Sequence, residues 1–181
     1  KTGGSEGFLI LFRVQSEKDF YWANLGGWGN KRHGLERGRS GEQRWHGVGK
    51  HVDGSIDKGR WHRIRVRCEK AHITVFVDDQ KLLDLADDAK AVLRGKVGVG
   101  TWATQAEYRN LKVTSFDGRT LFEGLPQSLS EPSTAHRWAA YGAGKAFLDC
   151  RRALNGEASQ RIVADAGESG LQQADFCIHA G

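Results

Sequence analysis

Residues 8–29 read FLILFRVQSEKDFYWANLGGWG, two apolar, aromatic-rich runs on either side of a polar segment, Gln15–Asp19. Runs of this kind, bounded by glycine and by polar turn residues, are the sequence signature of β-strands. The segment therefore predicts an antiparallel hairpin that ends in a Gly-Gly-Trp-Gly corner. Since no long amphipathic helical pattern follows in the chain, the predicted fold class is all-β, an antiparallel β-sandwich.

The second strand of this hairpin is expected to present two different faces, because alternate residues of a strand point to opposite sides of the sheet. Trp22 and Asn24 share one face, and Tyr21, Ala23 and Leu25 share the other. An indole beside an amide on a sheet face can stack on a sugar ring and hydrogen-bond its hydroxyl groups. Carbohydrate is therefore the first ligand class that the sequence suggests.

A second hairpin is predicted from residues 61–68 and 73–77, which alternate between apolar and polar side chains. In its first strand, the apolar side chains are expected to be buried and the arginines exposed. The apolar set is Ile64, Val66 and Cys68, and the exposed set is Arg63, Arg65 and Arg67. Trp61 has the parity of the arginines, and it either covers their stems or enters the core through a bulge, which we favour. Phe76 is expected to face outward, where an arginine can stack on it.

The chain has 181 residues, enough for one sandwich with or without a small second unit. We predict a first sandwich over residues 1–124, a linker with both prolines over 125–136, and a partial second β-sandwich segment over 137–181. Because three or so strands cannot form a sandwich alone, the second segment is either truncated or completed by the first. The chain begins at Lys1 and contains no methionine, which indicates an excised fragment or a processed chain.

The charge balance disfavours a nucleic-acid partner. The net charge is +5, the 22 acidic residues are mixed with the basic ones, and no nucleic-acid-binding motif is present. No apolar run approaches the ~20 residues that a membrane-spanning helix needs, so no membrane partner is expected. Of the three cysteines, Cys68 is expected to be a buried apolar residue, and a Cys150–Cys177 bridge is left open.

The sequence lacks the usual signatures of a catalytic centre. It contains no Glu-x-Asp-x-Glu strand, no Gly-x-Ser-x-Gly elbow and no His-Glu-x-x-His zinc motif. No catalytic residue, no metal site and no cofactor are therefore predicted. Asp53, Ser55 and Asp57 alternate in a loop and hint at calcium, without a complete calcium-binding pattern.

The candidate ligand-binding residues are aromatic and polar side chains around the glycine-rich corner. His33, His46 and His51 lie in the same region and could hydrogen-bond a ligand, and we select His33 among them. The predicted carbohydrate-binding residues are Trp22, Asn24, Trp28, His33 and Trp45. Tryptophan is often packed rather than exposed for a ligand, so packing remains the alternative for each indole.

Four segments, residues 1–12, 19–38, 59–84 and 95–126, together resemble a known module. They are similar to the concanavalin A-like (laminin-G-like) sandwich attached to bacterial alpha-L-arabinofuranosidases of glycoside hydrolase family 51. The most specific blocks are Tyr-Trp…Gly-Gly-Trp-Gly-Asn and Gly-Thr-Trp…Tyr-Arg-Asn-Leu-Lys-Val. Residues 141–181 resemble the start of a carbohydrate-binding jelly roll from the same enzymes.

The resemblance implies a non-catalytic accessory region of a secreted or periplasmic enzyme. Such a region binds or positions plant polysaccharide or oligosaccharide, or it braces an adjacent catalytic domain or chain. The catalytic work of that family belongs to a (β/α)8 barrel of ~250 residues, and its alternation of strand and helix is absent here. The resemblance also places the start of this chain inside the module, so that opening strands are expected to be missing.

Two alternatives from other functional classes stay open. The first is a sandwich-fold glycoside hydrolase in its own right, acting on a keto-sugar or a glucan, which needs two carboxylates within ~5–9 Å in a groove. The second is a laminin-G-like protein-interaction domain, which is expected to carry a calcium-rimmed surface.

Overall fold

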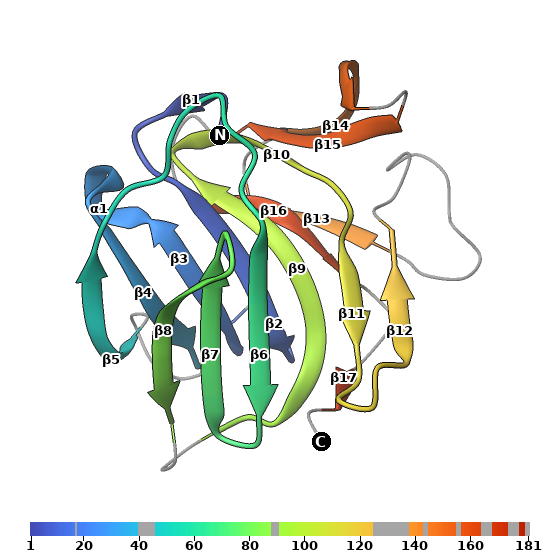
Figure 1. Ribbon diagram of the computed structural model, residues 1–181. Helices are drawn as coiled ribbons and strands as arrows, with labels where there is room; N and C mark the ends of the chain where they lie inside the picture. The colour runs from blue at the N-terminus through green and yellow to red at the C-terminus, as the bar shows by residue number, and fades with distance from the viewer. Residues whose placement is uncertain are drawn as a thin grey trace.

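The computed structural model describes residues 1–16, 18–39, 46–87 and 91–124, apart from the side chain of His46, and five later strands by their backbone. Almost all of the regular structure is β-strand, which confirms the predicted all-β fold class (Figure 1). The strands of the first part are β1 (Gly3–Gly4), β2 (Phe8–Val14), β3 (Phe20–Gly26), β4 (Arg32–Gly38), β5 (His46–Asp53), β6 (Ile64–Glu69), β7 (His72–Val77), β8 (Gln80–Ala86), β9 (Arg94–Trp102), β10 (Thr104–Tyr108), β11 (Lys112–Thr114) and β12 (Thr120–Glu123).

The later strands join the sheets of the first part. They are β13 (Trp138–Gly142), β14 (Lys145–Leu154), β15 (Glu157–Val163), β16 (Glu168–Gln173) and β17 (Ile178–His179). Strand β16 pairs with β9, and β15 pairs with β10, both antiparallel. The predicted linker, 125–136, lies outside the described residues, and the predicted domain boundaries stay a prediction.

Two facing sheets form the body of the molecule. The large sheet has the order β13-β16-β9-β2-β3-β4-β5, and a three-stranded sheet, β6-β7-β8, lies across one face of it (Figure 1). Between them is an apolar core with Tyr21, Ala23 and Leu25 from β3 and with Ile73 and Val75 from β7. Burial of this apolar area is the main stabilising contribution.

The face of β3 away from this core carries a second apolar cluster. It consists of Leu9, Leu11, Val14, Phe20 and Trp22, with Trp102 packed against it. The predicted division of β3 into two faces is therefore confirmed, because Trp22 and Tyr21 belong to different clusters. The hairpin register places Trp22 opposite Leu11 on β2 and opposite Glu36 on β4.

The predicted alternation of β6 is also confirmed. Its burial alternates strictly, and Ile64, Val66 and Cys68 pack against the main core. Burial raises the pKa of the Cys68 thiol to about 11, as expected for an apolar role. The guanidinium of Arg65 lies 4.2 Å from the ring centre of Phe76, which confirms the outward orientation of Phe76.

The prediction that Trp61 enters the core was wrong. Its side chain is 36% exposed, and the guanidinium of Arg109 lies 3.8 Å from the indole centre. Trp61 precedes the first residue of β6, and the chain enters that strand without the bulge that would turn the indole inward.

No helix within the described residues is long and apolar enough to cross a membrane.

Candidate functional site

The connection between β3 and β4 is a left-handed corner. The short segment α1 (Gly27–Asn30) is preceded by Gly26 in the left-handed conformation, with a φ of 74°. Gly29 adopts the same conformation at a φ of 72°, which glycine accepts without a steric cost. Trp28 also has a positive φ, 52°, and for a bulky residue this backbone conformation is a genuine outlier.

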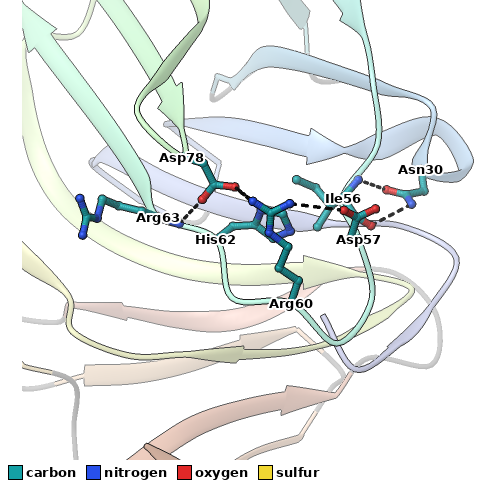
Figure 2. A network of polar contacts seen from close by, with 7 residues as sticks. All are labelled: Asn30, Ile56, Asp57, Arg60, His62, Arg63 and Asp78. Carbon is teal, nitrogen blue, oxygen red and sulfur yellow. Dashed lines mark hydrogen bonds and ion pairs between the residues drawn. The ribbon is translucent and has the colours of Figure 1, made fainter.

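The corner is fixed by polar contacts on both sides. The amide of Asn30 binds the backbone of Ile56 at two points, because Oδ1 accepts from Ile56 N–H at 2.9 Å and Nδ2 donates to Ile56 O at 3.1 Å (Figure 2). On the other side, the backbone N–H of Gly29 donates to Glu6 Oε1 at 2.7 Å. These contacts hold Trp28 in its strained conformation, and such strain in proteins gathers at ligand-binding positions.

The exposed indole of Trp28 stacks on an imidazole from β5. Trp28 is 37% exposed, and its ring centre lies 4.1 Å from that of His51 at an interplanar angle of 36°. The two rings cover Gly34 of β4. A Cβ atom at Gly34 would lie 2.6 Å from His51 Cδ2 and 3.1 Å from Trp28 Cη2, so the rings need a glycine beneath them.

Beside this stack, the sheet carries an amide and a carboxylate. The register pairs Asn24 with Gly34 and Trp22 with Glu36. One carboxylate oxygen, Glu36 Oε2, accepts from Trp22 Nε1 at 2.8 Å and from Asn24 Nδ2 at 3.0 Å. Among the described residues, the other oxygen, Oε1, accepts no hydrogen bond.

These four side chains, Asn24, Trp28, Glu36 and His51, define what we call the corner site. Asn24 and Glu36 are partly exposed and Trp28 and His51 are exposed. An aromatic surface, an amide, a carboxylate and an imidazole thus meet around a glycine floor. This combination suits a polyhydroxylated ligand, since rings contact the C–H face of a sugar and the polar groups bind its hydroxyls.

The other predicted binding residues lie elsewhere. Trp22 shares the sheet face of Asn24, but it is only 2% exposed and packs against Phe20 at a ring distance of 4.9 Å. Trp22 thus positions the Glu36 carboxylate rather than presenting its own ring face to solvent. Trp45 lies outside the described residues.

His33 supports the corner from the core side. Its ring is 4% exposed, and Nδ1 accepts a hydrogen bond from the backbone N–H of Gly26 at 3.0 Å. A Cβ atom at Gly54 would lie 2.3 Å from His33 Nε2, so the imidazole packs directly on that glycine. Burial lowers the pKa of His33, which keeps the ring neutral and able to accept this hydrogen bond.

Glu36 is the residue of the corner site that sequence reasoning missed. Its place beside Asn24 follows from the pairing register across the left-handed corner, and no local sequence pattern predicts that register. His51 was named from the sequence as one of three candidate histidines but was not selected. It reaches the site because the register of β4 and β5 shifts between His33 and Leu35, opposite residues 48–52.

A second polar network joins the loop after β5 to the turn between β7 and β8 (Figure 2). Asp78 is its centre, since its carboxylate contacts His62 Nδ1 at 2.9 Å, Arg60 Nη2 at 3.1 Å and the backbone N–H of Arg63 at 2.9 Å. Desolvation acts to raise the pKa of Asp78, but the hydrogen bonds from Arg63 and His62 outweigh it and lower that pKa. With these three partners, the Asp78 carboxylate fastens the loop.

The suggested calcium loop uses its carboxylates in ion pairs. Asp53 pairs with Arg32 at 3.7 Å, and Asp57 pairs with Arg60 at 3.8 Å. In the part of the chain that the structure describes, no three His, Cys, Asp or Glu side chains are grouped to hold a metal ion. Calcium binding stays a prediction that these contacts do not support.

Comparison with known proteins gives two matches. A family model described as a 3-keto-alpha-glucoside-1,2-lyase-like domain matches residues 9–114, which include the whole corner site. An extracellular exo-alpha-L-arabinofuranosidase from Streptomyces chartreusis is 35% identical over 91 residues. That alignment covers 50% of this chain and 11% of the relative, so the chain corresponds to a small part of that protein. No solved structure matches the chain significantly.

Proposed function

Because this chain belongs to the family of 3-keto-alpha-glucoside-1,2-lyase-like domains, we propose that it is a carbohydrate-binding β-sandwich that acts beside a glycoside hydrolase. The relationship to glycoside hydrolases rests on the family and on the partial match to an extracellular arabinofuranosidase. The narrower parts of the proposal are the non-catalytic role, secretion or a periplasmic location, and arabinose-containing plant polysaccharide as the ligand.

The observation that carries the proposal is the Trp28–His51 stack beside the amide of Asn24. The indole is held outside the sheet by a strained corner, and its centre lies 4.1 Å from the imidazole over a glycine floor. A furanose or pyranose ring can lie against this aromatic surface while Asn24 and Glu36 bind its hydroxyls. The carboxylate is already oriented by two donors, which reduces the entropy lost on binding.

The test is calorimetry of the chain with arabinan, arabinoxylan and their oligosaccharides at millimolar sugar. We expect binding that Trp28→Ala weakens by about tenfold or more, because aromatic contacts carry much of the energy at such sites. Leu93→Ala is the control, since Leu93 is 43% exposed and lies outside the corner site. Absence of heat with every sugar would rule out glycan binding and leave only a bracing role.

A second candidate function is elimination on a 3-keto sugar. It is favoured by the family description and by the partly exposed Glu36 and exposed His51, which give one sheet face two groups able to transfer protons. In such a step the base removes the proton on C2, next to the ketone. The electron pair forms the C1–C2 double bond, the C1–O bond breaks, and the second group gives a proton to the departing oxygen, so that the aglycone leaves as its alcohol.

This candidate is tested with a p-nitrophenyl 3-keto-α-glucoside. Release of nitrophenol by the pure chain together with a sugar that carries the C1–C2 double bond, both abolished in Glu36→Gln, would establish the lyase activity. No release above the buffer rate, combined with binding of arabinan, would establish the non-catalytic function instead.

A further inference from the structure

The outer side of the three-stranded sheet carries a row of arginines stacked on aromatic rings. The guanidinium of Arg65 lies 4.2 Å from the ring centre of Phe76, and that of Arg67 lies 5.0 Å from that of Phe116. At the start of β6, Arg109 stacks on Trp61 at 3.8 Å. We call these three pairs the arginine–aromatic stripe.

The stripe follows from the sequence of β6 and from its neighbours. Alternate residues of a strand lie about 6.8 Å apart on one face, and Arg65 and Arg67 occupy two such positions. Hairpin register places Phe76 directly opposite Arg65. Phe116 comes from the turn between β11 and β12, the hairpin drawn in yellow in Figure 1. The rings are accessible, since Phe116 is 54% exposed and Trp61 is 36% exposed.

The guanidinium groups of the stripe are only weakly neutralised. Among the described residues, neither Arg65 nor Arg109 forms an ion pair with a carboxylate. Nη1 of Arg109 is buried, so Arg65 and Arg67, whose side chains are exposed, supply the open guanidinium edges of the stripe. Arg67 pairs with Glu69 at 3.2 Å, and both side chains are more than half exposed. Exposed pairs of this kind contribute little and exchange readily with an incoming anion.

We propose that the arginine–aromatic stripe binds an acidic polysaccharide through the carboxylates of its uronic acid units. A guanidinium that lies over a ring can present its N–H edge to a carboxylate, which it matches in a bidentate geometry. The exposed faces of Trp61 and Phe116 contact the sugar rings between the charged groups. That the ligand is a glycan rather than a nucleic acid rests on the proposed function. That the ligand is an anion rests on the positive charges of the stripe arginines.

The stripe and the corner site lie on different sheets, since Arg65 and Arg67 belong to β6 and Asn24 and Glu36 belong to the large sheet. We therefore expect each site to bind its own ligand, independently of the other site. Neutral arabinan is expected at the corner site, and a uronate polymer is expected at the stripe.

The experiment compares polygalacturonate with its fully methyl-esterified, neutral form, using affinity electrophoresis and calorimetry at about 20 mM and about 0.5 M salt. We expect the acidic polymer alone to bind, and to be lost at high salt. The double variant R65Q/R67Q is expected to weaken binding by about tenfold or more. R65K/R67K keeps the charge but loses the planar fork of the guanidinium. Its affinity for the acidic polymer is expected to lie between those of the unmodified chain and of R65Q/R67Q.

The matched control is K18Q/K50Q, which removes two exposed positive charges outside the stripe. Equal losses in the control and the stripe variant, or equal binding of the esterified polymer, would overturn the proposal. Tighter binding of double-stranded DNA than of polygalacturonate would also overturn it. Because W28A is expected to weaken arabinan binding and to leave polygalacturonate binding intact, failure of this inference is distinguishable from failure of the proposed function.

Discussion

Trp28 is the residue on which the corner site depends most. Its φ of 52° costs a bulky side chain roughly 1–3 kcal/mol, and the fold retains it because Asn30 and Gly29 are bound on either side. A glycine at this position would remove the strain. The sequence of the corner therefore gives up stability to hold an exposed indole.

Comparison of two truncations tests this strain. Both Trp28→Gly and Trp28→Ala remove the indole, but only alanine keeps a Cβ atom in the left-handed conformation. We expect the glycine variant to be more stable by about 1 kcal/mol, because the Cβ atom clashes with the carbonyl in that region. Urea unfolding of both variants measures the difference. An alanine variant equal to or more stable than the glycine variant would show that the backbone is not strained.

Gly34 gives a second prediction at the level of single residues. A Cβ atom there would lie 2.6 Å from His51 Cδ2, the end of an exposed side chain that can move. We expect Gly34→Ala to cost about 1 kcal/mol or less of folding free energy but to weaken glycan binding several-fold. The binding losses of G34A and H51A should be strongly non-additive in the double variant, because both remove the same stack. Additive losses would contradict this.

Among the elements, β3 and β4 are joined to the end of β8 by a buried polar network. Tyr21 Oη donates to Asp87 Oδ2 at 2.6 Å, and Arg37 forms an ion pair with the same carboxylate oxygen. Desolvation acts to raise the pKa of Asp87, but the hydrogen bonds from Arg37 and Tyr21 outweigh it and lower that pKa. Folding therefore favours the ionised form of Asp87.

The ionised Asp87 makes the folding stability depend on pH. A carboxylate with a lowered folded pKa contributes stability above its unfolded pKa of about 3.9, and loses it as pH falls through the folded value. We expect the free energy of unfolding to drop below about pH 4. The Asp87→Asn variant is expected to be less stable at neutral pH, and its free energy of unfolding is expected to fall less steeply as the pH is lowered. Urea titrations between about pH 2 and pH 7 measure this. An unchanged slope in D87N would contradict the assignment to Asp87.

The hairpins also show what could be predicted from the sequence. Strict alternation identified the two faces of β3 and of β6, because period two is a local property that a short run displays. Trp61 has the parity of the exposed arginines, which indicated the outer face that it takes, and it was misplaced because a bulge into the core was favoured over that parity. Glu36 needed the register across a left-handed corner, and His51 needed the register shift in β5. Both are long-range pairings that only the folded sheet establishes.

The whole molecule presents two chemically different surfaces, one on each of the two facing sheets of its body. The corner site combines rings, an amide and a carboxylate, and the arginine–aromatic stripe combines rings with guanidinium groups. The alignment with the arabinofuranosidase covers 50% of this chain and only 11% of that protein. We propose that the corner site takes a neutral glycan and that the stripe takes an acidic one, so that one chain binds two components of a mixed polysaccharide.

Binding of a neutral sugar at the corner site is measured by nuclear magnetic resonance titration of the labelled chain with an arabino-oligosaccharide. We predict the largest shift changes at the Trp28 indole N–H, the Asn24 side-chain amide and the His51 ring, with the Trp61 indole N–H unmoved. Changes centred on Trp61 and the β6 arginines, or no changes at millimolar sugar, would show that neutral sugar does not bind at the corner site.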